Sequence, residues 1–398
     1  MEGIMKIERI IGRERNLLGD DLEQLNEVIS TEVANSSFLV LGGAGSIGQA
    51  VVKEIFKRSP KRLYVVDISE NNLVELVRDI RSSLGYIEGD FRTFALDIQS
   101  IEFIQFCKEL SGFDYVLNLS ALKHVRSEKD VFTLSRMIQV NIVNTIDTID
   151  WAIRSKVKKY FCVSTDKAAN PVNMMGASKR IMELFLLEKS KHIKISTARF
   201  ANVAFSDGSL LHGFSQRLSK KQPIVAPNDV RRYFVTPEES GLICLFSCLL
   251  GENNEIFFPK LSEDLHLIKF SDIAVAFLAE WGYQPLICNT EEEARQAFEQ
   301  LEPGCWPCLF SASDTTGEKD FEEFYTAAEE VNWDRFRNLG IVKNHSTVKS
   351  EQLNDFLAQF RHFQNEEHWS KDGLVKLFQA MIPDFDHEEK GKYLDAKM

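Results

Sequence analysis

The 398-residue sequence is poor in the features that place a chain in a membrane or on nucleic acid. No apolar run approaches the roughly 20 residues that a membrane-spanning helix requires. The first 15 residues contain neither a long apolar core nor a small-residue cleavage site, so we expect no signal peptide. Basic residues are the minority, with 47 Lys and Arg against 59 Asp and Glu, and the net charge of −12 argues against non-specific binding to nucleic acid. We therefore expect a soluble, cytoplasmic protein with no affinity for membranes or nucleic acids.

Cysteine is also scarce, with seven residues that are odd in number and scattered, which does not suit a disulfide framework. Cys305 and Cys308 have the C-x-x-C spacing of a redox motif, but they lie late in the chain and do not open a helix in a thioredoxin-like pattern. With no second such pair nearby, a tetrahedral zinc ion would lack ligands. The eight histidines show no H-x-x-x-H spacing with a nearby acid. We predict no metal site and interpret the cysteine pair as local packing.

The composition, 44% hydrophobic and 27% charged residues, is that of a globular chain with a packed core. From residue 38 onward, short apolar runs alternate with amphipathic stretches. This alternation predicts an α/β fold with a doubly wound parallel sheet, in which ligands bind beyond the carboxyl ends of the strands. The expected strands are 38–42, 62–67, 93–97, 114–120, 159–164 and 194–200, and the expected helices are 46–58, 69–84, 100–111, 132–156 and 174–191.

Four regions are expected along the chain. Residues 1–34 form a helical arm, in which leucine and isoleucine recur at three- and four-residue intervals from Leu17 to Ile29. Residues 35–200 form the nucleotide-binding domain, and residues 201–340 form a substrate-binding region that is interleaved with it. Residues 341–398 form a helical tail. Late helices are expected at 318–338 and 346–380.

A glycine-rich turn, GGAGSIG, follows the first expected strand at residues 42–48. Its glycines, Gly42, Gly45 and Gly48, allow a tight turn and a close approach of the backbone to a pyrophosphate. The helix that begins at Ser46 and Ile47 supplies free N–H groups to the anion. The spacing resembles that of the short-chain dehydrogenase/reductase superfamily in its extended form, which implies a Rossmann-type fold.

Acidic residues follow the next two strands. Asp67 lies 19 residues beyond Gly48, where its carboxylate would accept hydrogen bonds from the adenosine ribose and repel a 2′-phosphate. The cofactor is therefore expected to be NAD rather than NADP. The resemblance also implies that Asp97 and Ile98 bind the adenine, and that Ser120 and Ala121 line the cofactor site after the fourth strand.

The fifth strand is followed by STDK at residues 164–167, and then by NPVNMMGASK at residues 170–179. Superfamily members normally carry Tyr-x-x-x-Lys on the next helix, where one helical turn places both side chains on one face. Lys179 matches that lysine, but Met175 stands where the tyrosine is expected. Methionine cannot take a proton, which weakens the interpretation as an ordinary alcohol dehydrogenase. Asp166 and Lys167 indicate another chemistry.

Residues 164–179, together with SALKHV at 120–125 and RFANV at 199–203, resemble the nucleotide-sugar 4,6-dehydratases. The similarity is greatest to the UDP-N-acetylglucosamine 4,6-dehydratases of legionaminic acid and bacillosamine synthesis, and it covers roughly residues 36–330. In that group, a methionine at the position of Met175 accompanies retention of configuration at C5. We also expect a homo-oligomer.

Acid–base chemistry can be assigned to these residues independently of the resemblance. NAD takes hydride from C4 of the sugar, and the resulting ketone acidifies the C5 hydrogen. Lys167, if neutral, removes that hydrogen, and Asp166, if protonated, donates to the departing C6 hydroxyl. Burial and the nearby Lys179 would favour neutral Lys167. Thr165 could bind the C4 oxygen, and either Lys167 or a water accepts the C4 proton.

Three separate residues are expected to bind the substrate. Asn202 stands where family members contact the nucleotide-sugar diphosphate, Lys123 could neutralise phosphate or line the sugar pocket, and Arg232 lies in a segment that resembles a nucleotide-binding segment. Asp207 and Thr315 depart from the pattern, because relatives often have arginine at both positions. UDP over GDP is therefore a preference.

Two other functions remain open. A nucleotide-sugar 4-epimerase needs oxidation and re-reduction only at C4, for which the Asp166–Lys167 pair is superfluous and a tyrosine is desirable. A catalytically inactive, NAD-binding sensor or scaffold is supported by the missing tyrosine. Against an inactive protein stand the Asp166–Lys167 pair, Lys179 and the complete glycine turn.

Overall fold

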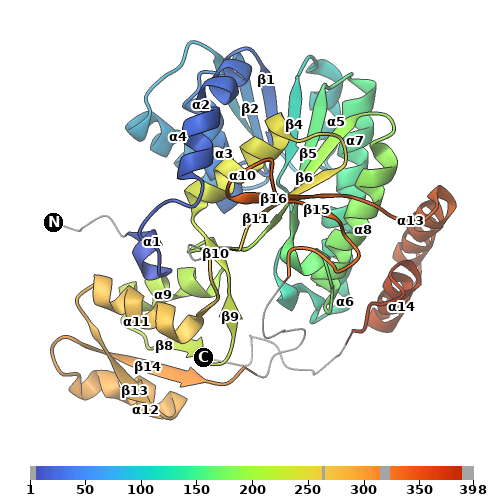
Figure 1. Ribbon diagram of the computed structural model, residues 1–398. Coiled ribbons are helices and arrows are strands. Elements are labelled where there is room, and N and C mark those ends of the chain that lie inside the picture. Colours follow the sequence, from blue (N-terminus) through green and yellow to red (C-terminus); the bar gives the residue numbers. More distant parts are fainter. Residues whose placement is uncertain (1–5, 262–264, 314–322, 388–398) are drawn as a thin grey trace.

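A mostly parallel β-sheet forms the centre of the computed structural model, which describes residues 6–261, 265–313 and 323–387 (Figure 1). Within these residues the sheet has nine strands in the order β15-β16-β11-β6-β5-β4-β1-β2-β3. Strand β16 runs antiparallel to both β11 and β15, and the other neighbours are parallel. The predicted doubly wound sheet is thus confirmed. The strands are β1 (Ser37–Leu41), β2 (Arg62–Asp67), β3 (Asp90–Ala95), β4 (Tyr115–Asn118), β5 (Lys159–Thr165), β6 (Lys194–Phe200), β11 (Glu255–Pro259), β15 (Val331–Asn332) and β16 (Leu339–Lys343).

Helices cover both faces of this sheet, because alternate residues of each central strand point to opposite sides. In β1, for example, Phe38 and Val40 join one buried cluster, whereas Leu39 and Leu41 join the other. The first cluster packs against α2 (Gly19–Ala34), α3 (Ser46–Phe56), α4 (Glu70–Ser83) and α10 (Pro237–Leu250). The second packs against α5 (Ile101–Glu109), α6 (Val131–Ile138), α7 (Asn144–Arg154), α8 (Met174–Lys189), α13 (Ser350–Gln364) and α14 (Lys371–Met381).

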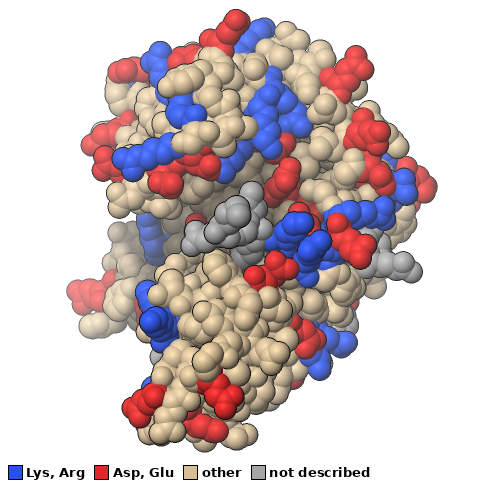
Figure 2. Space-filling view, turned by 90° about the vertical axis from the view of Figure 1, so that its left-hand side faces the viewer, with Lys and Arg blue, Asp and Glu red and all other residues tan. Residues whose placement is uncertain are grey.

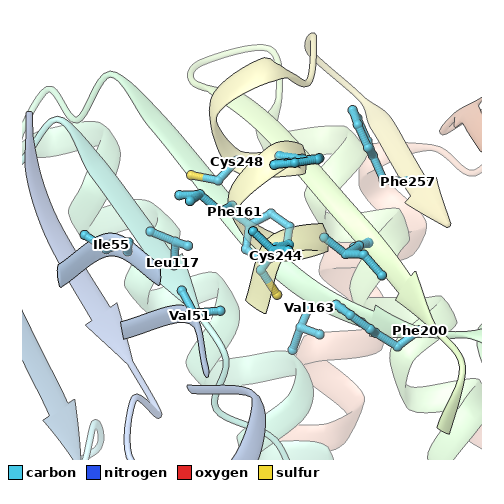
Figure 3. Close-up of a cluster of buried hydrophobic side chains, with 14 of the residues drawn as sticks. Val51, Ile55, Leu117, Phe161, Val163, Phe200, Cys244, Cys248 and Phe257 are labelled. Carbon is cyan, nitrogen blue, oxygen red and sulfur yellow. The ribbon is translucent and has the colours of Figure 1, made fainter. Parts of the chain in front are cut away.

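Helix α10 lies across the first face and packs closely against α3 (Figure 3). Cys244 and Cys248, one helical turn apart, point toward the side chains of β5 and β6, so they serve as small apolar core residues. A Cβ atom at Gly241 would lie 2.8 Å from the backbone of Ala50. The two helices therefore approach each other as closely as they do because residue 241 has no side chain.

A smaller lobe lies below the sheet in Figure 1. Its three-stranded parallel sheet has the order β13-β14-β8, and two further strand pairs, β7 with β10 and β9 with β12, lie beside it. The elements are β7 (Asn202–Val203), β8 (Ile224–Pro227), β9 (Arg231–Arg232), β10 (Phe234–Val235), β12 (Ile268–Lys269), β13 (Gln284–Cys288), β14 (Cys305–Ser311), α9 (Leu210–Ser219), α11 (Phe270–Glu280), α12 (Glu291–Gln296) and a 3₁₀ turn (Ala297–Gln300). Cys305 and Cys308 lie on β14 rather than at the start of a helix, and all seven cysteines are free.

The N-terminal arm connects the two lobes. Ile10 and Ile11, at and after the short helix α1 (Ile7–Ile10), are buried in the core of the smaller lobe, whereas Leu17 and Leu18 are buried against the large sheet. Between them, Arg13 donates two hydrogen bonds, of 2.7 and 2.6 Å, to the carboxylate of Glu239 on α10. Both side chains are buried, so this ion pair fixes the course of the arm.

Two predicted helices differ from the structure. The stretch predicted as one helix at 132–156 is helical up to Arg154, but a π-helical turn, Gln139–Val143, divides it between α6 and α7. Of the helix expected at 318–338, residues 318–322 lie outside the described part, and residues 323–338 form turns and β15, so that prediction is wrong. The physical reason is tertiary: the backbone of Phe324 and the side chain of Glu329 bind a buried arginine, which outweighs helix propensity. The helices expected at 346–380 are present as α13 and α14.

The surface is charged but mixed. On the face shown in Figure 2, acidic and basic side chains are interspersed, and the surface is hollowed between the two lobes. In the described part of the chain, no helix combines the length and the apolar character needed to cross a bilayer.

Strand β16 spans residue 340, where we expected the substrate-binding region to end, and it joins the large sheet.

Candidate active site

Four neighbouring strands bring the expected site residues to one edge of the large sheet. Strands β5, β4, β1 and β2 are adjacent in that order and parallel. Thr165 ends β5, Ser120 lies two residues beyond β4, Gly42 follows β1, and Asp67 ends β2. The carboxyl ends of these strands therefore meet at one site, as expected for an open α/β sheet.

The glycine turn has the shape of a phosphate cradle. Gly42 has a φ of +72°, and a Cβ atom there would lie 2.6 Å from the backbone nitrogen of Ser120. At Gly48 a Cβ would lie 2.2 Å from the carbonyl oxygen of Gly42, so the helix α3 can begin only if residue 48 is glycine. Gly45 differs, because the nearest protein atom to its Cβ position would be 3.8 Å away, which leaves open space above the turn.

The start of α3 fits an anionic group. Gly45 is its N-cap and provides no side-chain cap to the first N–H groups. Uncapped N–H groups at a helix N-terminus carry partial positive charge and bind phosphates. The Ser46 hydroxyl accepts a hydrogen bond of 2.8 Å from the backbone of Asp207, which ties this turn to the smaller lobe. The residues present therefore fit the pyrophosphate of a dinucleotide.

The acidic residues after β2 and β3 are both held by local contacts. One oxygen of Asp67 accepts from the backbone of Ala44 in the glycine turn at 2.9 Å, and the other accepts from Ser69 at 2.9 Å. The carboxylate is thus fixed beside the turn, and its remaining lone pairs can accept from ribose hydroxyls. Asp97, next to Ile98, forms a longer ion pair of 3.5 Å with Arg136 in the last turn of α6.

The acid–base residues at the end of β5 are in direct contact. Asp166 is 3% exposed, and its Oδ1 accepts from the Thr165 hydroxyl at 2.8 Å and from the backbone of Lys167 at 2.8 Å. The Lys167 Nζ lies 3.2 Å from the same oxygen. All side-chain hydrogen bonds of Asp166 in the described part of the chain use Oδ1, so Oδ2 is left for another partner. Thr165, Asp166 and Lys167 thus form one connected group.

Helix α8 packs directly against this group. A Cβ atom at Gly176 would lie 2.5 Å from the carbonyl oxygen of Lys167, so the glycine is required for the close approach. Met175 and Lys179, one turn apart on α8, are both buried. The Lys179 Nζ donates to the carbonyl of Val163 on β5 at 3.1 Å, and burial lowers the pKa of this lysine.

Sequence reasoning missed Asn141, which connects the cofactor side of the site with α8. Its side chain binds both backbone groups of Leu122, at 2.9 and 3.1 Å, and donates to the hydroxyl of Ser178 at 2.9 Å. It lies in the π-helical turn, a feature that often marks functional sites. The available signal was a polar residue inside the apolar stretch 132–156, which is too weak to identify a role.

The three expected substrate-binding residues lie on the side of the smaller lobe. Lys123 is exposed; partial desolvation lowers its pKa, and the nearby carboxylate of Asp207 opposes that shift. Asn202 on β7 binds the carbonyl of Tyr233 through its backbone at 3.0 Å. Tyr233 follows Arg232, which is buried on β9, so Asn202 and Arg232 are near each other. Thr315 lies outside the described residues.

A pocket of about 520 Å³ lies beside the glycine turn. It includes Ser46, Gln49 and Asp207, and continues along the outer side of α3 past Lys53 and Lys57. Asp67, Asp166 and Lys179 do not line it, so this pocket is adjacent to the group at the strand ends rather than part of it. No group of three or more His, Cys, Asp or Glu side chains in the described part of the chain is arranged to hold a metal ion.

The fold and the strand-end residues define a Rossmann-type α/β protein of the extended short-chain dehydrogenase/reductase superfamily. The family model described as "Polysaccharide biosynthesis protein" matches residues 38–343, and the chain belongs to this family. One relative is an uncharacterized membrane protein of Methanocaldococcus jannaschii, which is 31% identical over 65% of this chain and 76% of its own length.

Other relatives carry names that state an activity. A UDP-N-acetylglucosamine 4,6-dehydratase (inverting) of Campylobacter jejuni is 24% identical over 75% of this chain and 84% of its own length. A UDP-glucose 4-epimerase of Rickettsia prowazekii is 28% identical over 65% of this chain and 79% of its own. The chain spans about half the length of two further relatives, the polysaccharide biosynthesis proteins CapD of Staphylococcus aureus and EpsC of Bacillus subtilis.

Among solved structures, Pen from Bacillus thuringiensis matches with a TM-score of 0.64 at 21% identity. The match covers 83% of this chain and 98% of that one. At this identity the similarity establishes the fold alone.

Proposed function

We propose that the protein is an NAD-dependent 4,6-dehydratase that acts on UDP-N-acetylglucosamine. The observation that carries this proposal is the contact of 3.2 Å between Lys167 and Asp166 at the carboxyl end of β5. An acid and a base side by side suit the elimination of water, which needs both. The dehydratase named among the relatives supports the same reaction class.

Bound NAD would supply the oxidation at C4 of the sugar and the later reduction at C6. The chain itself would move the protons. Lys167 takes the proton from C5 while Asp166 donates a proton to the departing C6 hydroxyl, so that one water leaves. C5 then regains a proton, and the product is a 6-deoxy-4-keto sugar. The sum of the steps is the loss of one water from the nucleotide sugar.

The direct contact between Asp166 and Lys167 supports this division of roles. An elimination requires neutral Lys167 and protonated Asp166, which together hold the same number of protons as the ion pair between them. Because Asp166 is buried and bound through Oδ1, its Oδ2 can carry the proton toward the substrate. Thr165 already donates its hydroxyl proton to Asp166, so toward the C4 hydroxyl it would act as an acceptor.

Lys179 and Met175 would form the floor of the site. Lys179 is anchored on the carbonyl of Val163 and remains able to donate to the nicotinamide ribose. Met175 adds an apolar, non-titratable surface beside Lys167. We propose on this basis that the product retains its configuration at C5, although the dehydratase named among the relatives is inverting. The reaction would be an early step in the synthesis of bacterial amino sugars of the legionaminic acid or bacillosamine type.

The remaining proposed contacts bind the parts of NAD and the UDP part of the substrate. The glycine turn at residues 42–48 would bind the NAD pyrophosphate, with the ribose on Asp67, the adenine between Asp97 and Ile98, and the nicotinamide half near Ser120 and Ala121. Lys123, Asn202 and Arg232 would bind the UDP part. Lys123 would meet the diphosphate, because it lies near Asp207, whose backbone binds Ser46 in the glycine turn.

A 4-epimerase is the second candidate, which the epimerases among the relatives favour. Incubation with UDP-N-acetylglucosamine, followed by measurement of 4-ketone absorbance in alkali, separates the candidates. A ketone together with loss of water supports the dehydratase, whereas UDP-N-acetylgalactosamine would indicate the epimerase. No change in a protein loaded with NAD would favour the inactive sensor or scaffold.

A further inference from the structure

A buried ion network connects the catalytic side of the large sheet to residues 323–329. Arg199 on β6 is fully buried, and its Nε and Nη2 donate to the carboxylate of Glu183 on α8 at 3.0 and 2.8 Å. Its Nη1 and Nη2 also donate to Glu329 at 2.8 and 2.9 Å. One guanidinium thus binds two carboxylates, and removal of either would leave buried charge without its full complement of partners.

On one side, the network reaches the catalytic strand. The hydroxyl of Ser164 donates to Glu183 at 2.7 Å, and Ser164 is directly opposite Arg199 in the pairing of β5 with β6. Ser164 precedes the proposed catalytic residues in the chain. Glu183 lies four residues after Lys179, on the same face of α8. The network therefore lies directly behind the catalytic group.

On the other side, the network holds the 323–329 segment against two parts of the proposed site. The carbonyl of Phe324 accepts from Arg199 at 2.9 Å, and the ring of Phe324 packs on that of Tyr233 with centroids 5.7 Å apart. Glu323 accepts a hydrogen bond of 2.7 Å from Asn170, in the loop between the catalytic strand and α8. The segment thus contacts both the catalytic loop and the proposed nucleotide-binding strand.

We propose that the 323–329 segment holds the uridine diphosphate part of the substrate in register with Asp166 and Lys167, and that Arg199 and Glu329 are its positioning residues. This inference rests on the proposed function. It follows from connectivity: Tyr233 adjoins Arg232 and accepts from Asn202, and the segment fastens this region to the sheet that carries the catalytic group. Loss of the Glu329 contact therefore displaces the nucleotide relative to the catalytic residues.

The structure contains a matched control for this ion pair. Glu255, at the start of β11, is buried and binds Arg335 at 2.7 Å. This pair also fastens a late segment to the sheet, but Glu255 is paired with Ser196, toward the amino end of β6 and away from the site. Glu255→Gln removes a carboxylate–guanidinium pair of the same kind without touching the proposed substrate-binding region.

The test compares Glu329→Gln with Glu255→Gln by thermal unfolding, bound NAD, UDP affinity from calorimetry, and KM and kcat for UDP-N-acetylglucosamine. Both variants should unfold at a lower temperature than the parent and keep their NAD. Glu329→Gln alone should raise the Kd of UDP and the KM about tenfold, as expected for loss of a charge-assisted contact, with kcat changed less than about twofold. UDP affinity and KM equal to those of Glu255→Gln would overturn the proposal.

A second variant decides the matter if Glu329→Gln does not fold. Glu323 is exposed, so Glu323→Ala should fold normally and raise the Kd of UDP about threefold through loss of its hydrogen bond to Asn170. An unchanged Kd would then refute the proposal. If the parent binds UDP but forms no ketone, the dehydratase function fails, and the comparison of UDP affinities still tests the positioning role. A parent that binds no UDP would refute the positioning role as well.

Discussion

Replacement of Asp166 by asparagine tests the proposed chemistry with little change to the structure. Asparagine has the same shape, and its carbonyl oxygen can accept the hydrogen bonds that Oδ1 now accepts from Thr165 and Lys167. What Asp166→Asn loses is the proton for the C6 hydroxyl. We therefore expect a folded, NAD-loaded protein in which water elimination is blocked while oxidation at C4 and proton removal at C5 remain possible.

The expected magnitude follows from the role of a general acid. Such groups contribute about 10²–10⁴-fold, which corresponds to about 3–5 kcal/mol of activation free energy. Burial of Asp166 places the effect toward the upper part of that range, because bulk water has little access to replace the acid. Lys167→Met should cost at least as much, since the base at C5 is lost.

The assay follows the substrate by proton NMR in deuterated water. Asp166→Asn should exchange the C5 hydrogen for deuterium without losing the C6 hydroxyl, whereas Lys167→Met should show neither change. Asp90→Asn, at the amino end of β3 and therefore far from the site, serves as the carboxylate-to-amide control. More than about a tenth of the parent activity in Asp166→Asn, or C5 exchange in Lys167→Met, would refute the assignment of acid and base.

Four further outcomes are expected. Asp67→Ala should weaken NAD binding, since hydrogen bonds to a charged group are worth about 1.5–3 kcal/mol each, and equal affinity of the parent for NADP would contradict the role of Asp67. Gly45→Ala should lower NAD affinity without lowering the unfolding temperature of the cofactor-free protein, because its Cβ enters the open space above the turn. The control is Gly213→Ala, whose Cβ meets no atom within 4 Å and which should keep its NAD. Burial alone would raise the pKa of Glu183, but the charge and hydrogen bonds of Arg199 lower it from 4.5 to about 2, so the stability gained from this pair should be present above pH 4.5 and lost as the pH falls toward 2. Above pH 4.5, Glu183→Gln should therefore unfold at a lower temperature than the parent, and its unfolding temperature should change less between pH 4.5 and pH 2. An unchanged pH dependence of the unfolding temperature would contradict the network. Ring couplings of the fresh product should show the xylo configuration at C5, and an arabino product would overturn the role given to Met175.

The sequence predicts those parts of the fold that a single short segment identifies by itself. Strands such as β1 and β2 could be located because four or more apolar residues in a row are bounded by turn residues, as in a strand buried on both faces. The glycine turn could be recognised because Gly42 and Gly48 each fill a position where a Cβ would collide with backbone. In both cases the physical requirement lies within a few residues of the signal.

Interactions between distant residues were not predictable in this way. Arg199 is 16 residues from Glu183 and 130 residues from Glu329, so no local pattern indicates that one guanidinium joins them. The same contacts explain why the glutamate-rich stretch after residue 323 is not a helix. Asn141 likewise acquires its role only when the π-helical turn brings it to Leu122 and Ser178.

The methionine at position 175 limits which side chains are available for the proposed proton transfers. Met175 is buried and cannot exchange a proton, so the titratable side chains that the described structure places at this strand end and on the facing turn of α8 are Asp166, Lys167 and Lys179. Lys179 is oriented by its hydrogen bond to Val163, which leaves the Asp166–Lys167 pair for proton transfer. Oxidation and re-reduction at a single carbon need one acid–base group, whereas elimination across two carbons needs an acid and a base that act together. The Asp166–Lys167 pair offers both groups, and this is the physical argument for proposing dehydration over epimerisation.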